Sequence, residues 1–182
     1  MKNTHKLVTM GLFAAISVVL VFLVHFPIFP AVAFLEYDPA DIPILICTFL
    51  WGPLSGLALT SVVSILQGIT VSSASGIIGI VMHIFSTGSY CLVSGFIYKR
   101  NKTKKNAIKA IIAGVITMTL TMIIWNLLVT PHFMGLPVKA VISLLPWIIA
   151  FNFLKAMING VISYFVYKPV STNLKKTKNI KL

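Results

Sequence analysis

Five stretches of about 20 mostly apolar residues dominate this sequence, at 7–25, 54–70, 76–98, 107–129 and 146–167. A helix needs roughly 20 such residues to cross the hydrocarbon core of a bilayer. Only 10% of the residues are charged and 58% are hydrophobic, which leaves too little polar surface for a soluble domain of 182 residues. The sequence therefore predicts an all-α integral membrane protein.

A shorter apolar stretch at 41–51 adds one more helix to this prediction. It opens on Asp41, with Pro43 just inside, and stops at Trp51-Gly52-Pro53. An early proline and a capping Asp are typical of a helix start, and Gly-Pro favours a break in the helix. We expect six transmembrane helices in a single membrane domain covering residues 1–182.

Basic residues gather in three regions, at the N-terminus, at 99–109 and from Lys168 onward, where the last of them are Lys178 and Lys181. These regions share one side of the membrane only if the spans number six. Because cytoplasmic loops carry an excess of Lys and Arg, we expect both termini in the cytoplasm and the loop at 26–40 outside. The net charge of +12 then reflects topology and attraction to anionic membrane lipid, with no nucleic acid partner.

All three acidic side chains of the sequence, Glu36, Asp38 and Asp41, lie at the end of that loop and the start of the helix that follows. An ionised carboxylate buried without a partner is costly, so each needs water, a cation, a capping role or a ligand. Asp41 is expected either to cap the helix that follows or to contact a ligand. Asp38 precedes a proline and is expected to begin a turn or to contact a ligand.

The last apolar stretch carries a polar stripe at spacings of three and four, which places its members on one helix face. The stripe consists of Asn152, Lys155, Asn159 and Ser163. A lysine at membrane depth costs roughly 2.5 to 3.5 kcal/mol on insertion scales, so Lys155 needs an acceptor. Either one of the three acids pairs with it structurally, or it contacts a bound solute.

Asn126, in the stretch before, lies like Asn152 and Lys155 in the outer half of its helix, on the side where the loop at 26–40 arrives. Together they predict a pocket open to the outside for a neutral, planar solute rich in heteroatoms. The two amides could instead form hydrogen bonds between helices. His83 is either a buried core histidine or a further contact.

Several segments resemble the substrate-binding S components of energy-coupling factor (ECF) vitamin transporters, and are most similar to the riboflavin-specific branch. The segments are Phe26-Pro27-Ile28-Phe29-Pro30, Glu36-Tyr37-Asp38-Pro39-Ala40-Asp41-Ile42-Pro43, Trp51-Gly52-Pro53-Leu54-Ser55-Gly56, Asn126 and Asn152-x-x-Lys155. The chain departs from many riboflavin-specific members in its third helix, where Ser64 and Gln67 stand in place of a Lys-Asn pair.

This resemblance implies that riboflavin, or a related vitamin, is the transported ligand and that no cofactor is bound. It implies a site formed by Asn126, Asn152 and Lys155 under a lid loop, and we expect Asp38, Tyr37, Leu35 and His83 to complete that site. It also implies a transmembrane coupling subunit and two cytoplasmic ATPase subunits as partners. In the family a face of small residues on the first helix meets the coupling subunit, and Gly11, Ala14 and Ala15 fit that face.

The sequence contains no Gly-x-x-x-x-Gly-Lys-Ser/Thr phosphate loop and no spacing typical of a metal site. We therefore expect a multi-pass binding subunit of the cell membrane rather than an enzyme. Two alternatives remain open. One is an S component for another vitamin or vitamin precursor. The more distant one is a membrane-embedded, metal-dependent enzyme acting on lipid phosphates, with the three acids as metal ligands.

Overall fold

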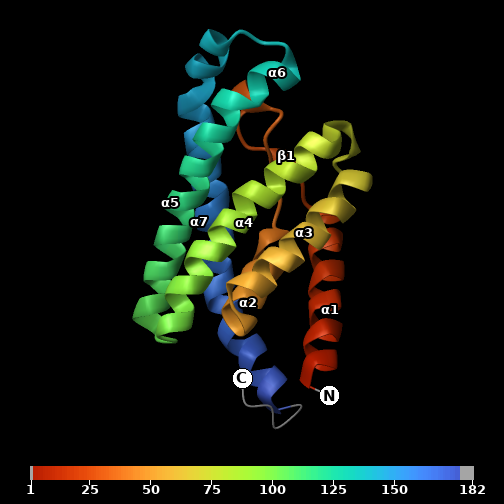
Figure 1. Cartoon of the computed structure of the whole chain (residues 1–182), viewed down its shortest axis with the longest axis vertical. Helices are drawn as coiled ribbons and strands as arrows, with labels where there is room; N and C mark the ends of the chain where they lie inside the picture. Colours follow the sequence, from red (N-terminus) through yellow and green to blue (C-terminus); the bar gives the residue numbers. More distant parts are fainter. Residues whose placement is uncertain (1, 177–182) are drawn as a thin grey trace.

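The computed structural model describes residues 2–176, and helices account for nearly all of its regular structure (Figure 1). Lys178 and Lys181, part of the C-terminal basic region, lie outside the described residues. The main helices are α1 (Lys2–Leu23), α2 (Asp41–Trp51), α3 (Pro53–Ile69), α4 (Gly76–Arg100), α5 (Lys104–Leu128) and α7 (Val138–Lys176). Shorter elements are the helix α6 (Thr130–Met134) and the 3-10 turns η1 (Pro30–Val32) and η2 (Ser73–Ser75).

Within residues 2–176, four helices are long and apolar enough to cross a membrane: α1, α4, α5 and α7. Helices α2 and α3 are apolar but have only 11 and 17 residues. At 1.5 Å per residue, a helix of 11 residues is about 16 Å long, half the thickness of the hydrocarbon core. The protein is thus an all-helical, multi-pass membrane protein with four candidate spans by length, whereas the sequence predicts six.

The ends of the helices follow local chemistry. Thr103 caps α5, because its side-chain oxygen accepts a hydrogen bond from the backbone N–H of Asn106 at 3.3 Å. Gly52 separates α2 from α3 with a φ of 93°, a conformation that favours glycine, and Pro53 opens α3. The capping role predicted as one option for Asp41 is wrong. Asp41 is the first helical residue, and the cap position is Ala40 without a side-chain hydrogen bond.

Helix α7 extends at both ends beyond the range 146–167 expected from the sequence. Pro146 and Pro169 therefore both lie inside it. A proline inside a helix removes one backbone hydrogen bond, and in a membrane neighbouring helices and side chains compensate for that loss. Helix α7 packs along α5 and α2. Its residues therefore reach from one end of the bundle to the other (Figure 1).

The loop at 26–40 contains a small hairpin, which the sequence does not predict. Strand β1 (Phe26–Pro27) pairs antiparallel with β2 (Glu36–Tyr37), at the end of the molecule opposite both termini (Figure 1). Between the strands, Val32 and Leu35 are buried against Val141, Ile148 and Phe151 of α7. This apolar contact holds the acidic end of the loop against the last helix.

Tyr90 of α4 lies at the centre of the contact between α4, α5 and α7. It is fully buried, and its hydroxyl donates a hydrogen bond to the carbonyl oxygen of Ala156 at 3.4 Å. A side chain added at Gly114 or Gly160 would collide with Tyr90. The two glycines therefore let three helices approach one tyrosine closely.

Candidate functional site

Lys155 and Asp38 form a buried ion pair between α7 and the loop. The ammonium nitrogen Nζ lies 2.7 Å from Asp38 Oδ2 and 3.5 Å from the carbonyl oxygen of Glu36. Asp38 Oδ1 accepts from the backbone N–H of Ala40 at 3.0 Å, which is the turn predicted for an Asp before proline. The deep lysine thus has its acceptor, and the carboxylate is satisfied at both oxygens.

Asn159 connects the same loop to α7 one helical turn further on. Its Nδ2 donates to the carbonyl oxygen of Asp38 at 3.0 Å and to Asp41 Oδ2 at 3.3 Å. Its Oδ1 accepts from the hydroxyl of Tyr37 at 3.1 Å. Burial, followed by the nearby charge of Asp38, raises the pKa of Tyr37, so this hydroxyl keeps its proton and donates.

Asp41 extends the network to α4 and α3. Its Oδ1 accepts from Thr87 Oγ1 at 2.8 Å and from His83 Nε2 at 3.2 Å. His83 Nδ1 is 2.7 Å from Ser64 Oγ. Hydrogen bonds therefore run without a break from α3 through α4 and the start of α2 to α7, inside a protein that is otherwise largely apolar.

A small cavity of about 90 Å³ borders this network, and Asp38, His83 and Lys155 all line it. Ser64 and Gln67 of α3 lie on its wall as well. Gln67 is 6% exposed, and its Nε2 has no hydrogen-bond partner. A buried amide donor without an acceptor is costly, which makes it a place where a ligand oxygen would be stabilised.

The structure does not bring Asn126 and Asn152 into this cluster. Asn126 Nδ2 donates to Met122 O at 2.8 Å, and its Oδ1 accepts from Thr130 at 2.9 Å. Asn152 Nδ2 donates to Ile148 O at 2.8 Å. The amide N–H groups of both bond within their own helices, neither residue lines the small cavity, and both are buried.

Of the other predicted site residues, Asp38, Tyr37, His83 and Lys155 come together, and Leu35 lies in the apolar contact beneath the loop. The sequence-based site leaves out Asn159 and Thr87. Asn159 lies four residues after Lys155 and Thr87 four after His83, so helical spacing places each on the same face as a predicted residue. That spacing is the signal that could have identified them.

Helix α1 presents small residues away from the bundle. Gly11 and Ala15 are exposed, and a side chain added at Gly11 would meet nothing within 4 Å. Ala14, beside them, is buried. Of the predicted interface, Gly11 and Ala15 are therefore available to a partner, whereas Ala14 packs inside the protein.

Within residues 2–176, no group of three or more His, Cys, Asp or Glu side chains could hold a metal ion. Glu36 is exposed, and Asp38 and Asp41 are engaged by Lys155 and His83. This arrangement lends no support to the metal-dependent enzyme considered above.

A family model described as "ECF transporter, substrate-specific component" matches residues 5–170. The riboflavin transporter RibU of Streptococcus thermophilus is 27% identical over 97% of this chain and 87% of its own length. The riboflavin transporter FmnP of Bacillus subtilis is 28% identical, over 93% of this chain and 92% of its own length. RibU of Staphylococcus aureus is 26% identical, over 97% and 95%.

Solved structures show the same architecture. The S component of a bacterial ECF transporter superposes with a TM-score of 0.79 at 27% identity, over 96% of this chain and 99% of that one. The S component for biotin from an ECF-type transporter gives a TM-score of 0.60 at 19% identity, over 92% and 93%, which shows a shared fold.

Proposed function

The chain belongs to the substrate-specific components of ECF transporters, and we propose that it captures riboflavin outside the cell for ATP-driven uptake by partner subunits. One observation carries this proposal: three relatives that match over at least 93% of the chain are riboflavin transporters. In this role the protein is a binding subunit rather than an enzyme, and riboflavin is its cargo rather than a cofactor. A related vitamin is the alternative ligand.

The partners follow from the same assignment. Substrate-specific components work with a module of transmembrane and ATPase subunits, and here we assign one coupling subunit and two cytoplasmic ATPases to that module. The outward Gly11 and Ala15 on α1 support a close helix contact with the coupling subunit, because small side chains let two helix backbones approach. The side chain of Ala14 is buried inside the protein, so Ala14 would contact the coupling subunit only through its backbone.

We place the vitamin beside the hairpin, with Lys155, Asp38 and His83 on one wall and the free amide donor of Gln67 on another. This placement is supported by their common cavity and by the unpaired Gln67 Nε2. Tyr37 and Leu35 act as parts of the lid. Asn126 and Asn152 join the site only if they exchange their bonds within the helix for bonds to the ligand.

The cavity of about 90 Å³ is smaller than the roughly 300 to 1,000 Å³ typical of ligand sites. A planar aromatic ligand therefore requires the hairpin to move away from α3 and α4. The apolar contact of Leu35 and the ion pair of Lys155 hold the hairpin on α7. We propose that capture opens this lid and that closure over the vitamin restores contacts with α7.

We propose six spans with both termini in the cytoplasm, in which α2 and α3 count as spans although each is short. The proposal is supported by the arrangement of the ends: both termini and the connection between α4 and α5 lie at one end, and the hairpin at the other (Figure 1). That end carries the basic residues, as expected of a cytoplasmic face.

The decisive experiment is a titration of the detergent-purified protein with riboflavin, monitored by quenching of flavin fluorescence and preceded by an absorbance spectrum. We expect saturable quenching at one flavin per chain, and no competition from an excess of biotin. Gln67→Leu, which removes the free donor without shortening the side chain much, should weaken binding by about 0.5 to 1.5 kcal/mol. Flavin fluorescence that stays unchanged would assign the site to another vitamin.

A further inference from the structure

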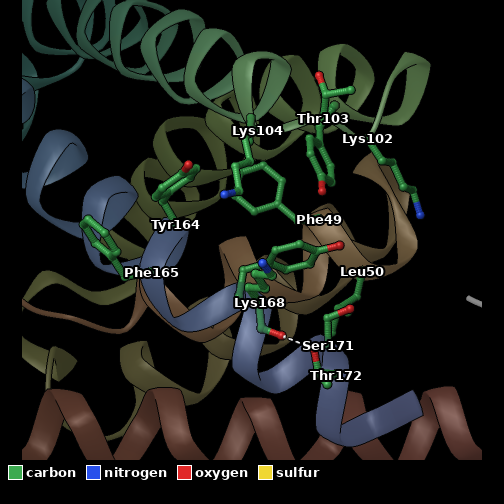
Figure 2. Close-up of a pocket in the computed structure, with 13 residues that line it drawn as sticks. Phe49, Leu50, Lys102, Thr103, Lys104, Tyr164, Phe165, Lys168, Ser171 and Thr172 are labelled. Atoms are coloured by element: carbon green, nitrogen blue, oxygen red, sulfur yellow. Dashed lines mark hydrogen bonds between the residues drawn. The ribbon is translucent and has the colours of Figure 1, made fainter. Parts of the chain in front are cut away.

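A much larger cavity, of about 570 Å³, lies beside the connection between α4 and α5, at the end of the bundle opposite the hairpin (Figures 1 and 2). Its walls come from the end of α2, the connection between α4 and α5, the start of α5 and the last turns of α7. None of the residues in the network around Lys155 lines it. The cavity is therefore separate from the proposed vitamin site, and capture of a vitamin gives it no role.

Three lysines line this cavity. Lys104 of α5 and Lys168 of α7 come from opposite walls, and Lys102 lies at the edge (Figure 2). The three acidic side chains of the sequence are Glu36, Asp38 and Asp41, and none of them lines this cavity, so no acidic side chain in its walls balances the charge. None of the three lysines forms an ion pair within residues 2–176. Cations on facing walls without a counter-charge favour an anion between them.

The rest of the lining suits a phosphate group attached to an apolar body. Phe49, Tyr98 and Tyr167 pack on one another with ring centroids 5.1 to 5.9 Å apart, which gives the cavity a rigid aromatic wall. Ser171 adds a hydroxyl group that can donate to a phosphate oxygen, whereas the Thr172 hydroxyl donates to the carbonyl oxygen of Lys168 at 2.9 Å. Phe165, also part of the lining, is 68% exposed and offers apolar surface next to the opening.

We propose that this cavity binds the phosphate headgroup of an anionic membrane lipid, with its acyl chains lying along the outside of α7 near Phe165. Basic pockets between helices on the cytoplasmic side are suited to such headgroups. Free phosphate shares the headgroup chemistry, but it would use neither the aromatic wall nor the exposed apolar surface. The inference rests on the proposed membrane orientation and is independent of which vitamin is carried.

The test uses native mass spectrometry of the full chain in a neutral detergent, with dioctanoyl phosphatidylglycerol as the probe. Dioctanoyl phosphatidylcholine and inorganic phosphate form the two comparison arms. We expect one tightly retained phosphatidylglycerol per chain and much weaker retention of phosphatidylcholine and phosphate. Equal retention of both lipids overturns the proposal, and so does phosphate binding as tight as that of phosphatidylglycerol, which would indicate a free-anion site.

A charge-matched pair of variants localises the lipid. The triple variant Lys102→Gln, Lys104→Gln, Lys168→Gln should lower phosphatidylglycerol affinity by about 100-fold, since a lysine near an anionic surface contributes about fivefold. Lys99→Gln, Lys105→Gln, Lys109→Gln removes the same charge at the same end, from residues outside this lining, and should retain the lipid. An equal loss of phosphatidylglycerol affinity in both triple variants would contradict the proposed location of the lipid.

Thermal unfolding of both variants in detergent reports whether they are folded, and this measurement does not depend on which vitamin the protein binds. If the triple variant does not fold, Lys168→Gln alone should weaken lipid retention about fivefold. Unchanged retention in Lys168→Gln would then overturn the proposal.

Discussion

At the scale of single residues, the pairing of Lys155 with Asp38 has two consequences that need to be separated. Removing one member of a buried ion pair leaves an uncompensated charge, which is strongly destabilising. The same lysine lines the cavity proposed for the vitamin. A single substitution therefore alters stability and binding together, and only a double substitution distinguishes the two roles.

We expect Lys155→Met alone to destabilise the protein by about 3 to 5 kcal/mol, because Asp38 remains buried without its cation. The double variant Lys155→Met, Asp38→Asn should recover most of that loss, as measured by thermal unfolding in detergent. Riboflavin affinity of the double variant should remain weaker by about 1.5 to 3 kcal/mol, the range for a hydrogen bond to a charged group.

Lys139→Met serves as the control, since Lys139 is exposed on the same helix and should affect neither measurement. If the double variant bound riboflavin with full affinity, Lys155 would have only a structural role.

The sequence predicts that Lys155 needs an acceptor, because its depth in an apolar helix is readable from the pattern alone. It does not predict which acid pairs with it, since Asp38 lies 117 residues away and the register between loop and helix is a tertiary property. The same limit applies to Asn126 and Asn152. Their positions on the helices are readable, but their bonds within the helix depend on the neighbouring packing.

At the scale of helices, close packing around Tyr90 is the feature most sensitive to substitution. We expect Gly114→Ala to destabilise the protein by about 1 to 3 kcal/mol, because the added methyl group would overlap the Tyr90 ring, which is fully buried. Thermal unfolding in detergent measures the change.

Gly11→Ala is the matched control and should have the opposite sign. Its added methyl group meets nothing within 4 Å, and alanine is favoured over glycine inside a helix by about 0.5 to 1 kcal/mol. If Gly114→Ala and Gly11→Ala had equal melting temperatures, the contact between α4 and α5 around Tyr90 would accommodate an added methyl group without loss of stability.

Apolar length is a strong signal for long helices, and the sequence accordingly predicts an all-helical membrane protein. The hairpin is too short to leave a pattern of alternating residues, since each strand has two residues. The predicted start of the last helix at Pro146 is wrong. Local rules favour proline at the start of a helix, but Pro146 lies inside α7. In both places the loop and α7 pack on one another, a tertiary contact that local sequence rules do not include.

At the scale of the whole molecule, the proposed orientation predicts which end a membrane-impermeant maleimide reaches. Cys47 and Cys91 are fully buried, so the unsubstituted protein should label weakly. Ala33→Cys, in the hairpin loop, should label in intact cells. Asn101→Cys, between α4 and α5, should label only after the cells are permeabilised, and the reverse pattern would mean an inverted topology.

A bulky residue on the outward face of α1 should separate capture from transport. Ala15→Trp is expected to leave riboflavin quenching unchanged, because Ala15 lies outside the bundle, and to abolish uptake by blocking the coupling subunit. Ile116→Trp, at a 52% exposed position on α5, is the control and should support uptake. Normal uptake by Ala15→Trp would place the interface elsewhere.

The long-range network also orders events during synthesis of the chain. Asp41 meets His83 and Thr87 when α4 emerges, but Asp38 must wait a further stretch of chain for Lys155, which is synthesised 117 residues after it. At roughly 5 to 20 residues per second, that wait is about 6 to 23 seconds. During this interval the newly inserted helices hold a carboxylate without its cation. A nascent chain interrupted before α7 therefore differs from a finished one in carrying Asp38 without Lys155.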